Sequence, residues 1–332
     1  MDQHGNLTIV GTDQPNVDGY LKSTGQAVYG SDFGLPGMLI GKYLRSRHPH
    51  ARILNIDVDR AKKLKGVRAV VTGKDFPKRF GLILRDQNFM AVDRVRYVGE
   101  PVVGVAAVDL DTALEALELI RVEYEPLPAL FDPLESIKDD AFLIHPELGE
   151  YECAPSFHPV AGTNVANHFK IRTGDVDEAF RQSDLVYEGT YTTPAVDHVY
   201  MEPNAHVAQF TRDGRLTLWA NTQTTYLSRL KLSETLELPM SKVRVMATYV
   251  GGGFGGKHFQ AQPETVALAM KTDGTPVKVQ FTREESFQAT SLRHPSVVTV
   301  QSGVKKDGTL VARKNTVIMD TGAFSERGVM VT

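Results

Sequence analysis

Residues 250–258 read VGGGFGGKH, with five glycines at positions 251, 252, 253, 255 and 256 around Phe254. Glycine loses more backbone freedom on folding than any other residue, so such a run is expected where the chain needs positive φ or where a ligand approaches closely. Successive N–H groups in a loop of this kind can form a concave anion-binding site. The preceding apolar segment, residues 243–250, predicts a strand. The sequence therefore predicts a strand that runs directly into a ligand-binding glycine loop.

Three interpretations of this loop follow from its spacing alone. Its first, third and last glycines match the GxGxxG pattern of dinucleotide-binding folds, although Pro263 predicts that the next helix begins well after the last glycine. With Lys257 the loop matches most of a phosphate-binding P-loop, although His258 stands where Ser or Thr should bind magnesium. A glycine turn without a ligand is the third interpretation. Lys257 is then either a contact for a cofactor phosphate or a partly exposed charge.

The chain outward from the loop mixes the two periodicities of strands and helices. Asp109 or Asp111 is predicted to cap a helix that continues to about Ile120, and Asp175 to cap a short one over residues 175–182. Further helices are expected over residues 228–236 and 263–271. Strands are expected over residues 38–44, 53–58, 68–72, 96–98, 102–108, 122–124, 185–191, 196–210, 216–220, 277–281, 296–303 and 310–320. This mixture predicts an α+β protein.

Two domains are expected from the distribution of these elements. Residues 1–140 form the first, residues 141–170 lose periodicity and gain proline and glycine as a linker or wrapping loop, and residues 171–332 form the second. The last segment, residues 316–332, has the pattern of a strand followed by an unfinished loop. We therefore expect that the tail packs elsewhere or that a second chain continues the domain.

Composition excludes several classes of protein. The 332 residues are 42% hydrophobic and 23% charged, as in globular proteins, and the net charge of −3 argues against nucleic acid as a partner. The single cysteine, Cys153, cannot form an internal disulfide or hold an iron–sulfur cluster. No apolar stretch is long enough for a membrane span and no signal peptide is visible, so a cytoplasmic protein is expected. His198, Glu202 and His206 could share one strand face as metal ligands, but Pro203 interrupts that strand and favours a structural role.

Several motifs together resemble the molybdenum hydroxylases, the xanthine dehydrogenase and aldehyde oxidase family. They are VGGGFGGK at residues 250–257, WANTQ at 219–223, LELPMSKVRV at 236–245 and RHP at 293–295. In the first domain, DGYLKSTGQAVYGSD, PGMLIGKYLRSRHPHARI and RVRYVGEPVVGVAA resemble the family's α/β hammerhead domain. The resemblance implies a hammerhead domain followed by the first portion of a molybdopterin-binding domain.

The resemblance also implies the roles of individual residues. Gln223 would donate to or accept from an oxygen ligand of molybdenum, and Phe254 would form one wall of a planar substrate pocket; these two are the expected catalytic residues. His258 stands where some purine-hydroxylating members carry a glutamate, so it would contact the substrate. No side chain of this chain would ligate the metal. The expected cofactor-binding residues are Gln223, Gly252, Gly253, Phe254, Gly255 and Gly256.

By the same resemblance, the chain is one half of a split molybdenum subunit, or a truncated part of one, and is catalytic only when assembled. The enzyme would hydroxylate a nitrogen heterocycle, nicotinate-like or purine-like, with water as the oxygen source. The cofactor would be molybdenum–molybdopterin in its dinucleotide form. Iron–sulfur clusters and FAD would lie on partner subunits, beside a chain that carries the second half of the molybdopterin-binding domain. A hydroxybenzoyl-CoA reductase-like member, an aldehyde-oxidising member and a non-catalytic scaffold half are the alternatives.

Overall fold

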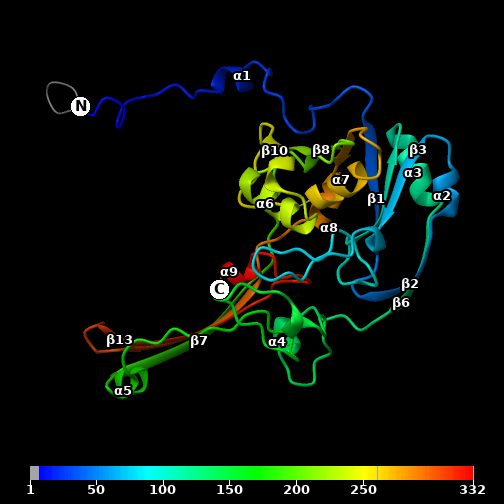
Figure 1. The fold of residues 1–332 in the computed structure, drawn as a ribbon. Helices are drawn as coiled ribbons and strands as arrows, with labels where there is room; N and C mark the ends of the chain where they lie inside the picture. Colours follow the sequence, from blue (N-terminus) through cyan, green and yellow to red (C-terminus); the bar gives the residue numbers. More distant parts are fainter. Residues whose placement is uncertain (1–6, 260, 332) are drawn as a thin grey trace.

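The computed structural model describes residues 7–259 and 261–331, drawn in Figure 1. The strands are β1 (Leu39–Arg45), β2 (Ala51–Asp57), β3 (Val67–Thr72), β4 (Arg94–Val95), β5 (Pro101–Ala107), β6 (Arg121–Pro126), β7 (Leu185–Thr193), β8 (Ala205–Phe210), β9 (Leu216–Ala220), β10 (Val243–Ala247), β11 (Val277–Gln280), β12 (Ser296–Val304) and β13 (Leu310–Met319). The helices are α1 (Gly19–Ser23), α2 (Asp59–Lys63), α3 (Leu110–Glu118), α4 (Pro133–Ser136), α5 (Val176–Arg181), α6 (Thr225–Thr235), α7 (Gln262–Ala269), α8 (Arg283–Ala289) and α9 (Gly328–Val331). This is the α+β class that the sequence predicted. Within the described ranges no helix has the length and apolar character needed to cross a bilayer.

The main sheet has seven strands in the order β10-β9-β8-β11-β1-β5-β3. Strands from the first and second predicted domains meet where β1 pairs in parallel with β11, with Leu39 opposite Val277. Gly41 stands at this junction because a Cβ there would lie 2.7 Å from side-chain carbons of both Leu268 in α7 and Val279 in β11. One continuous sheet thus connects the two predicted domains, whose bounds remain a prediction.

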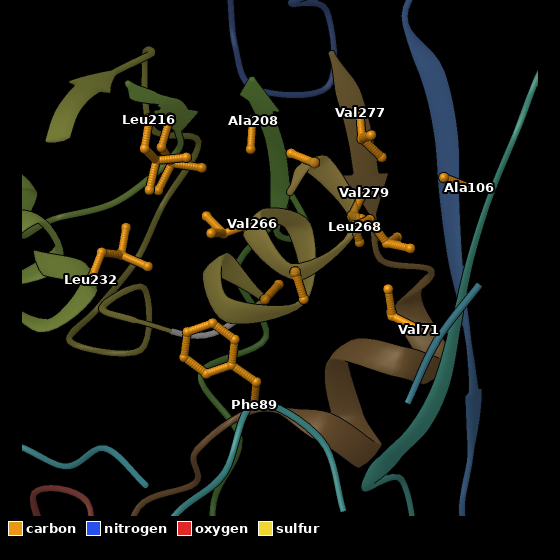
Figure 2. Close-up of a cluster of buried hydrophobic side chains, with 14 of the residues drawn as sticks. Val71, Phe89, Ala106, Ala208, Leu216, Leu232, Val266, Leu268, Val277 and Val279 are labelled. Atoms are coloured by element: carbon orange, nitrogen blue, oxygen red, sulfur yellow. The ribbon is translucent and has the colours of Figure 1, made fainter. Parts of the chain in front are cut away.

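Helix α7 is buried along its whole length. Figure 2 shows Val266 and Leu268 of this helix among apolar side chains of the main sheet and of α6. A helix surrounded by the core needs apolar or small residues on all sides rather than on one stripe. The glycine loop ends a few residues before α7, so the C-terminal side of the loop is anchored in the core.

The first part of the chain forms its own apolar cluster around β5, which is buried at every position. The run PVVGVAA lacks polar alternation, as expected of a strand covered on both faces. Helix α3 packs on this part of the sheet, and the side chain of its N-cap Asp109 accepts a hydrogen bond from the N–H of Thr112. The strands β4, β2 and β6 form a second, three-stranded sheet beside it.

A third sheet, β13-β12-β7, is antiparallel and extends away from the main body of the molecule (Figure 1). Its strands pair over long registers, from Ser296 opposite Thr193 to Val304 opposite Leu185. The short helix α5 packs against β12 and β13 at the outer end of this sheet. The three strands were predicted within a few residues of their observed bounds.

Two local predictions were wrong, and one helix was not predicted. Residues 196–204 form a loop rather than a strand, because Pro203 has no N–H for a ladder and Val199 has a φ of 44°. Residues 96–98 are not a strand, since β4 ends at Val95. Helix α8 was not predicted, although its N-cap Thr282 and Glu285 form a reciprocal capping box.

Candidate functional site

The glycine loop, residues 251–256, forms a tight turn at its tip. The N–H of Gly256 donates to the carbonyl of Gly253 at 2.6 Å, and the two residues between them both have positive φ, 49° at Phe254 and 91° at Gly255. A turn with positive φ at both central positions is disfavoured for a bulky residue such as phenylalanine. The aromatic side chain is nevertheless held outward, 74% exposed. Backbone strain of this kind concentrates at functional sites.

Gln223 fixes the geometry of this turn. Its Oε1 atom accepts the N–H groups of Gly255 and Lys257, each at 3.2 Å, and its own N–H donates to the Lys257 carbonyl at 2.8 Å. A Cβ at Gly253 would lie 2.5 Å from this same Oε1, so a larger residue there would displace the Gln223 side chain. The Nε2 amide of Gln223 donates to no residue in the described part of the chain. Gln223 therefore holds the loop with its oxygen and presents an N–H₂ group that none of the described residues accepts.

Glu202 and Lys257 form an ion pair that holds the two ends of the glycine loop. The Glu202 carboxylate accepts from the N–H of Gly251 at 2.7 Å, from the N–H of Gly30 at 2.8 Å and from Lys257 Nζ at 2.8 Å. Burial alone would raise the pKa of Glu202, but the ion pair with Lys257 and the Gly251 N–H outweigh it and lower that pKa. Burial lowers the pKa of Lys257, and Glu202 opposes this effect. The Lys257 ammonium also lies 4.7 Å from the centre of the Tyr200 ring.

Both sequence interpretations of Lys257 are consequently wrong. Its side chain is 0% exposed and paired with Glu202, so it is neither a partly exposed charge nor placed to neutralise a phosphate in front of the loop. The P-loop interpretation is therefore wrong as well, because it needs Lys257 to contact a phosphate. The dinucleotide-binding interpretation fails because α7 begins at Gln262, beyond the last glycine of the loop at Gly256, so no helix N-terminus faces the glycines.

A cavity of about 1090 Å³ opens beside the loop. Phe254, Gly255 and His258 line it, together with Asp197 and His198. The Nδ1 atoms of His258 and His198 and the Oδ2 atom of Asp197 are buried without a hydrogen-bond partner among the described residues. Burial, together with the nearby Arg327 guanidinium, lowers the pKa of His258, so its imidazole is neutral at pH 7. Buried polar atoms without protein partners are rare, and a polar ligand or ordered water in the cavity would satisfy these.

The structure brings together all the residues that the sequence nominated. Gln223, Phe254 and His258 meet around one turn, with Gly252, Gly253, Gly255 and Gly256 supplying its backbone. Their assigned roles stay predictions. No group of three or more His, Cys, Asp or Glu side chains is arranged for a metal in residues 7–259 and 261–331, and Glu202 serves instead as the anchor of the loop.

The sequence did not predict that Glu202 anchors the glycine loop or that His198 packs against it. Glu202 lies 49 residues before Gly251, so no local spacing connects them. The only signal in the sequence was the position of Glu202 beside Pro203, in a segment whose strand pattern Pro203 interrupts. His198 packs against the loop from the same segment, since a Cβ at Gly256 would lie 2.9 Å from its Nδ1.

Comparison with known proteins covers almost the whole chain. A model of the molybdopterin cofactor-binding domain matches residues 157–332. A model of the aldehyde oxidase and xanthine dehydrogenase a/b hammerhead domain matches residues 24–128. The nicotinate dehydrogenase large molybdopterin subunit of Eubacterium barkeri is 35% identical over 325 residues, covering 97% of this chain and 73% of that protein. A probable xanthine dehydrogenase subunit of Bacillus subtilis (strain 168) is 39% identical over 317 residues, covering 95% of this chain and 40% of that protein.

Solved structures give the same picture. Carbon monoxide dehydrogenase from Oligotropha carboxidovorans is similar with a TM-score of 0.82 and 31% identity, over 92% of this chain and 39% of that one. Aldehyde oxidoreductase from Desulfovibrio gigas is similar with a TM-score of 0.85 and 25% identity, over 97% of this chain and 36% of that one. The chain thus spans about 40% of the length of several of the relatives that it matches, and about three quarters of the Eubacterium barkeri protein.

Proposed function

Because this chain belongs to the molybdenum hydroxylase family of xanthine dehydrogenases and aldehyde oxidases, we propose that it is the N-terminal portion of the molybdopterin-binding subunit of a hydroxylase of nitrogen heterocycles. The family membership predicted from the motifs is confirmed, and with it an oxidoreductase that uses molybdopterin. The names of the relatives, xanthine dehydrogenase and nicotinate dehydrogenase, support a purine-like or nicotinate-like substrate.

The loop fits an oxygen-rich cofactor. The N–H groups of Gly252 and Phe254 donate to no described residue and neither residue is buried, so two donors are available to a ligand. The side of Gly255 is open, with no atom within 4 Å of the position that a Cβ would take. The free N–H₂ group of Gln223 adds a neutral donor that keeps its charge state during a reaction. These features support the proposal that Gln223 and residues 252–256 bind the cofactor.

The molybdenum cofactor, when bound, supplies the two-electron oxidation, with water as the oxygen source. The chain's own residues contribute binding and orientation. Phe254, fixed by its turn and exposed to the cavity, offers a flat apolar face against which a planar ring can stack. His258, neutral at pH 7, offers a ring nitrogen to a polar group of that substrate. We therefore propose Gln223 and Phe254 as catalytic residues and His258 as a substrate contact.

The proposed enzyme is an assembly. The names of three relatives, each of which designates one subunit of an enzyme or of a dehydrogenase complex, support a multi-subunit complex. Cys153 alone cannot hold an iron–sulfur cluster, so the clusters, and FAD, are proposed to lie on other subunits. The remainder of the molybdopterin-binding subunit is proposed to complete the site, and the cofactor to be the dinucleotide form.

The free Nε2 amide of Gln223 beside the open turn carries the proposal, and substitution of Gln223 tests it. The native assembly is purified, its molybdenum is measured by mass spectrometry, and oxidation of nicotinate and of xanthine is followed with a dye as electron acceptor. Gln223→Ala should lower turnover at least about a hundredfold, the usual effect of removing one preorganised donor. Gln301→Ala, on the distant sheet, should leave turnover unchanged. An assembly without molybdenum, or with full activity in Gln223→Ala, would overturn the proposed function.

A further inference from the structure

The segment between β13 and α9, residues 320–327, forms one wall of the cavity beside the glycine loop. Every residue of this segment lines the cavity, and none belongs to a helix or strand. Ala323, Phe324 and Ser325 also line a second, small pocket whose other lining residues include Asp86 and His145. We call residues 320–327 the wall segment. Because it has no ladder hydrogen bonds, its position depends on the groups that hold its backbone.

Two buried side chains hold the wall segment on the side of the small pocket. The Nε2 atom of His145 lies 2.7 Å from the carbonyl oxygen of Ala323, and the Asp86 carboxylate accepts the N–H of Ser325 at 2.6 Å. His145 is 9% exposed and Asp86 is 4% exposed. The ring of Phe324 packs edge-on against the His145 ring, with 5.4 Å between their centres. The backbone is thus fixed on both sides of Phe324.

The proton positions of His145 follow from its partners. Burial, assisted by the nearby Arg96 guanidinium, lowers the pKa of His145 to about 4, so its imidazole is neutral at pH 7 and carries a single N–H. The Ala323 carbonyl can only accept, so this hydrogen is assigned to Nε2. Nδ1 is then an acceptor for the Tyr151 hydroxyl, whose oxygen lies 2.9 Å away, nearer than the 3.3 Å that separates it from the Glu147 carboxylate. His145 is therefore a donor to the wall segment.

The long loop between the two predicted domains sets the position of His145. The N–H of Ile144, the residue before it, donates to Asn164 Oδ1 at 2.9 Å. The Ile144 carbonyl accepts from Arg96 Nε at 3.2 Å. Both backbone groups next to the histidine are therefore held, and residues 141–170 act as a fixed support rather than as a loose linker. A side chain held in this way keeps its N–H directed at one acceptor.

We propose that His145 is a positioning residue for substrate selection, which fixes the wall segment through the Ala323 carbonyl and so determines which ring the cavity admits. This inference rests on the proposed function and deepens it. His145 lines the small pocket and not the cavity, so it acts through the wall segment and not by contact with a substrate. Loss of its N–H leaves a buried carbonyl without a donor, which loosens the wall segment. A cavity with a loose wall discriminates less between one-ring and two-ring substrates.

Two amide substitutions of different reach separate the two hydrogen bonds of His145. The Nε2 of His145→Gln reaches the place of the imidazole Nε2 and keeps the bond to Ala323. The amide of His145→Asn reaches only the place of Nδ1, so it keeps the Tyr151 contact and loses the bond to Ala323. His145→Phe fills the space of the ring but cannot donate, and it should repeat the result of His145→Asn. His158→Asn, at an exposed position of the same loop, is the control.

The first measurement is hydrogen–deuterium exchange of the native assembly, followed by mass spectrometry. The peptide that contains the wall segment should exchange at least about tenfold faster in His145→Asn, because the buried carbonyl has lost its donor. His145→Gln and His158→Asn should stay within about twofold of the wild type. A peptide from β5 should exchange at the wild-type rate in all variants, which shows that the fold is intact. Wild-type exchange of the wall segment in both His145→Asn and His145→Phe would overturn the proposal.

The second measurement is the ratio of kcat/KM for nicotinate to kcat/KM for xanthine. This ratio does not depend on the fraction of enzyme that carries cofactor, because both substrates share that fraction. His145→Asn should shift the ratio at least about fivefold toward the poorer substrate, and His145→Gln should keep it within about twofold. A merely structural role would lower both values equally and leave the ratio unchanged, which would also overturn the proposal.

The failure of this inference is distinguishable from failure of the proposed function. A wild-type assembly that turns over substrate, with an unchanged ratio or unchanged exchange in His145→Asn, would contradict the positioning role alone. A wild-type assembly that oxidises neither ring would contradict the proposed function, and the exchange measurement would still decide whether His145 fixes the wall segment.

Discussion

At the scale of single residues, Phe254 has a backbone conformation that is unfavourable for its own side chain. The hydrogen bonds and ion pair of the neighbouring residues impose this conformation. Gln223 binds the N–H groups on both sides of Gly256, Glu202 binds the N–H of Gly251, and the buried Lys257 ends the loop. A residue at positive φ persists only where the surroundings over-determine it. The rigid turn thus presents a fixed aromatic face and two N–H groups before any ligand arrives, which lowers the entropy lost on binding.

Glu100, which also lines the cavity, gives a prediction of pH dependence. Burial raises the pKa of Glu100 to about 7, and the hydrogen bond that its carboxylate accepts from the Arg96 N–H at 2.6 Å only partly opposes this. Between pH 4.5 and 7 the folded chain therefore keeps a proton that the unfolded chain has lost. The contribution of Glu100 to the free energy of unfolding must fall as pH rises through this interval, by at most about 1.4 kcal/mol per pH unit.

Glu100→Gln removes this titration while its side-chain oxygen still accepts the Arg96 N–H. Urea denaturation at intervals of pH should show the stability of the variant gaining on that of the wild type from pH 5 to pH 7. Glu123→Gln, at an exposed position of β6, serves as the control and should run parallel to the wild type. Parallel profiles for Glu100→Gln as well would show that Glu100 does not carry the effect.

At the scale of elements, the structure of α3 shows which of the two predicted N-cap residues, Asp109 or Asp111, begins the helix. Asp109 has extended backbone angles and its side chain accepts from the Thr112 N–H at 2.8 Å, whereas Asp111 lies inside the first turn of the helix. Asp109→Ala should lower the free energy of unfolding by about 1 kcal/mol, the usual value of an N-cap. Asp111→Ala should change it by at most about 0.5 kcal/mol. Urea denaturation of both variants measures this, and equal effects would contradict the assignment.

The elements also show which features of the fold could be predicted from local sequence patterns and which could not. The run at β5, the cap at Asp109 and the alternation of β7 are local patterns, and each predicted its element within a few residues. The capping box of α8 was equally local and was overlooked. The anchor of the glycine loop was not accessible in this way, because Glu202 meets Gly251 only after the sheet has formed. Family motifs nominated residues that the structure brings together around one turn, but the strain at Phe254 and the burial of Lys257 follow from tertiary packing.

At the scale of the whole molecule, the two predicted domains share their sheet and a buried network of charges. Arg45 of β1 pairs with Glu264 of α7 at 2.8 Å and with Glu285 of α8 at 3.3 Å, and Lys42 pairs with Glu285 at 3.0 Å. The Arg45 guanidinium also lies 4.6 Å from the centre of the Phe281 ring. Every one of these contacts joins β1 to the second part of the chain, so the two parts should not unfold separately.

The chain should therefore unfold in a single transition. Trp219, the only tryptophan, lies in β9 and stacks on Phe33 from the first part at 5.5 Å between ring centres, so its fluorescence reports the contact between the two parts. The fluorescence transition in urea should coincide with that of far-ultraviolet circular dichroism. Arg45→Met should lower the free energy of unfolding by about 3–5 kcal/mol, because it leaves the buried Glu264 carboxylate without its partner and removes one of the two cations beside Glu285. Arg52→Met, which removes an exposed ion pair with Glu125, should lower it by at most about 1 kcal/mol. Two separate transitions in the wild type, or equal effects of the two substitutions, would mean that the shared sheet does not couple the two parts.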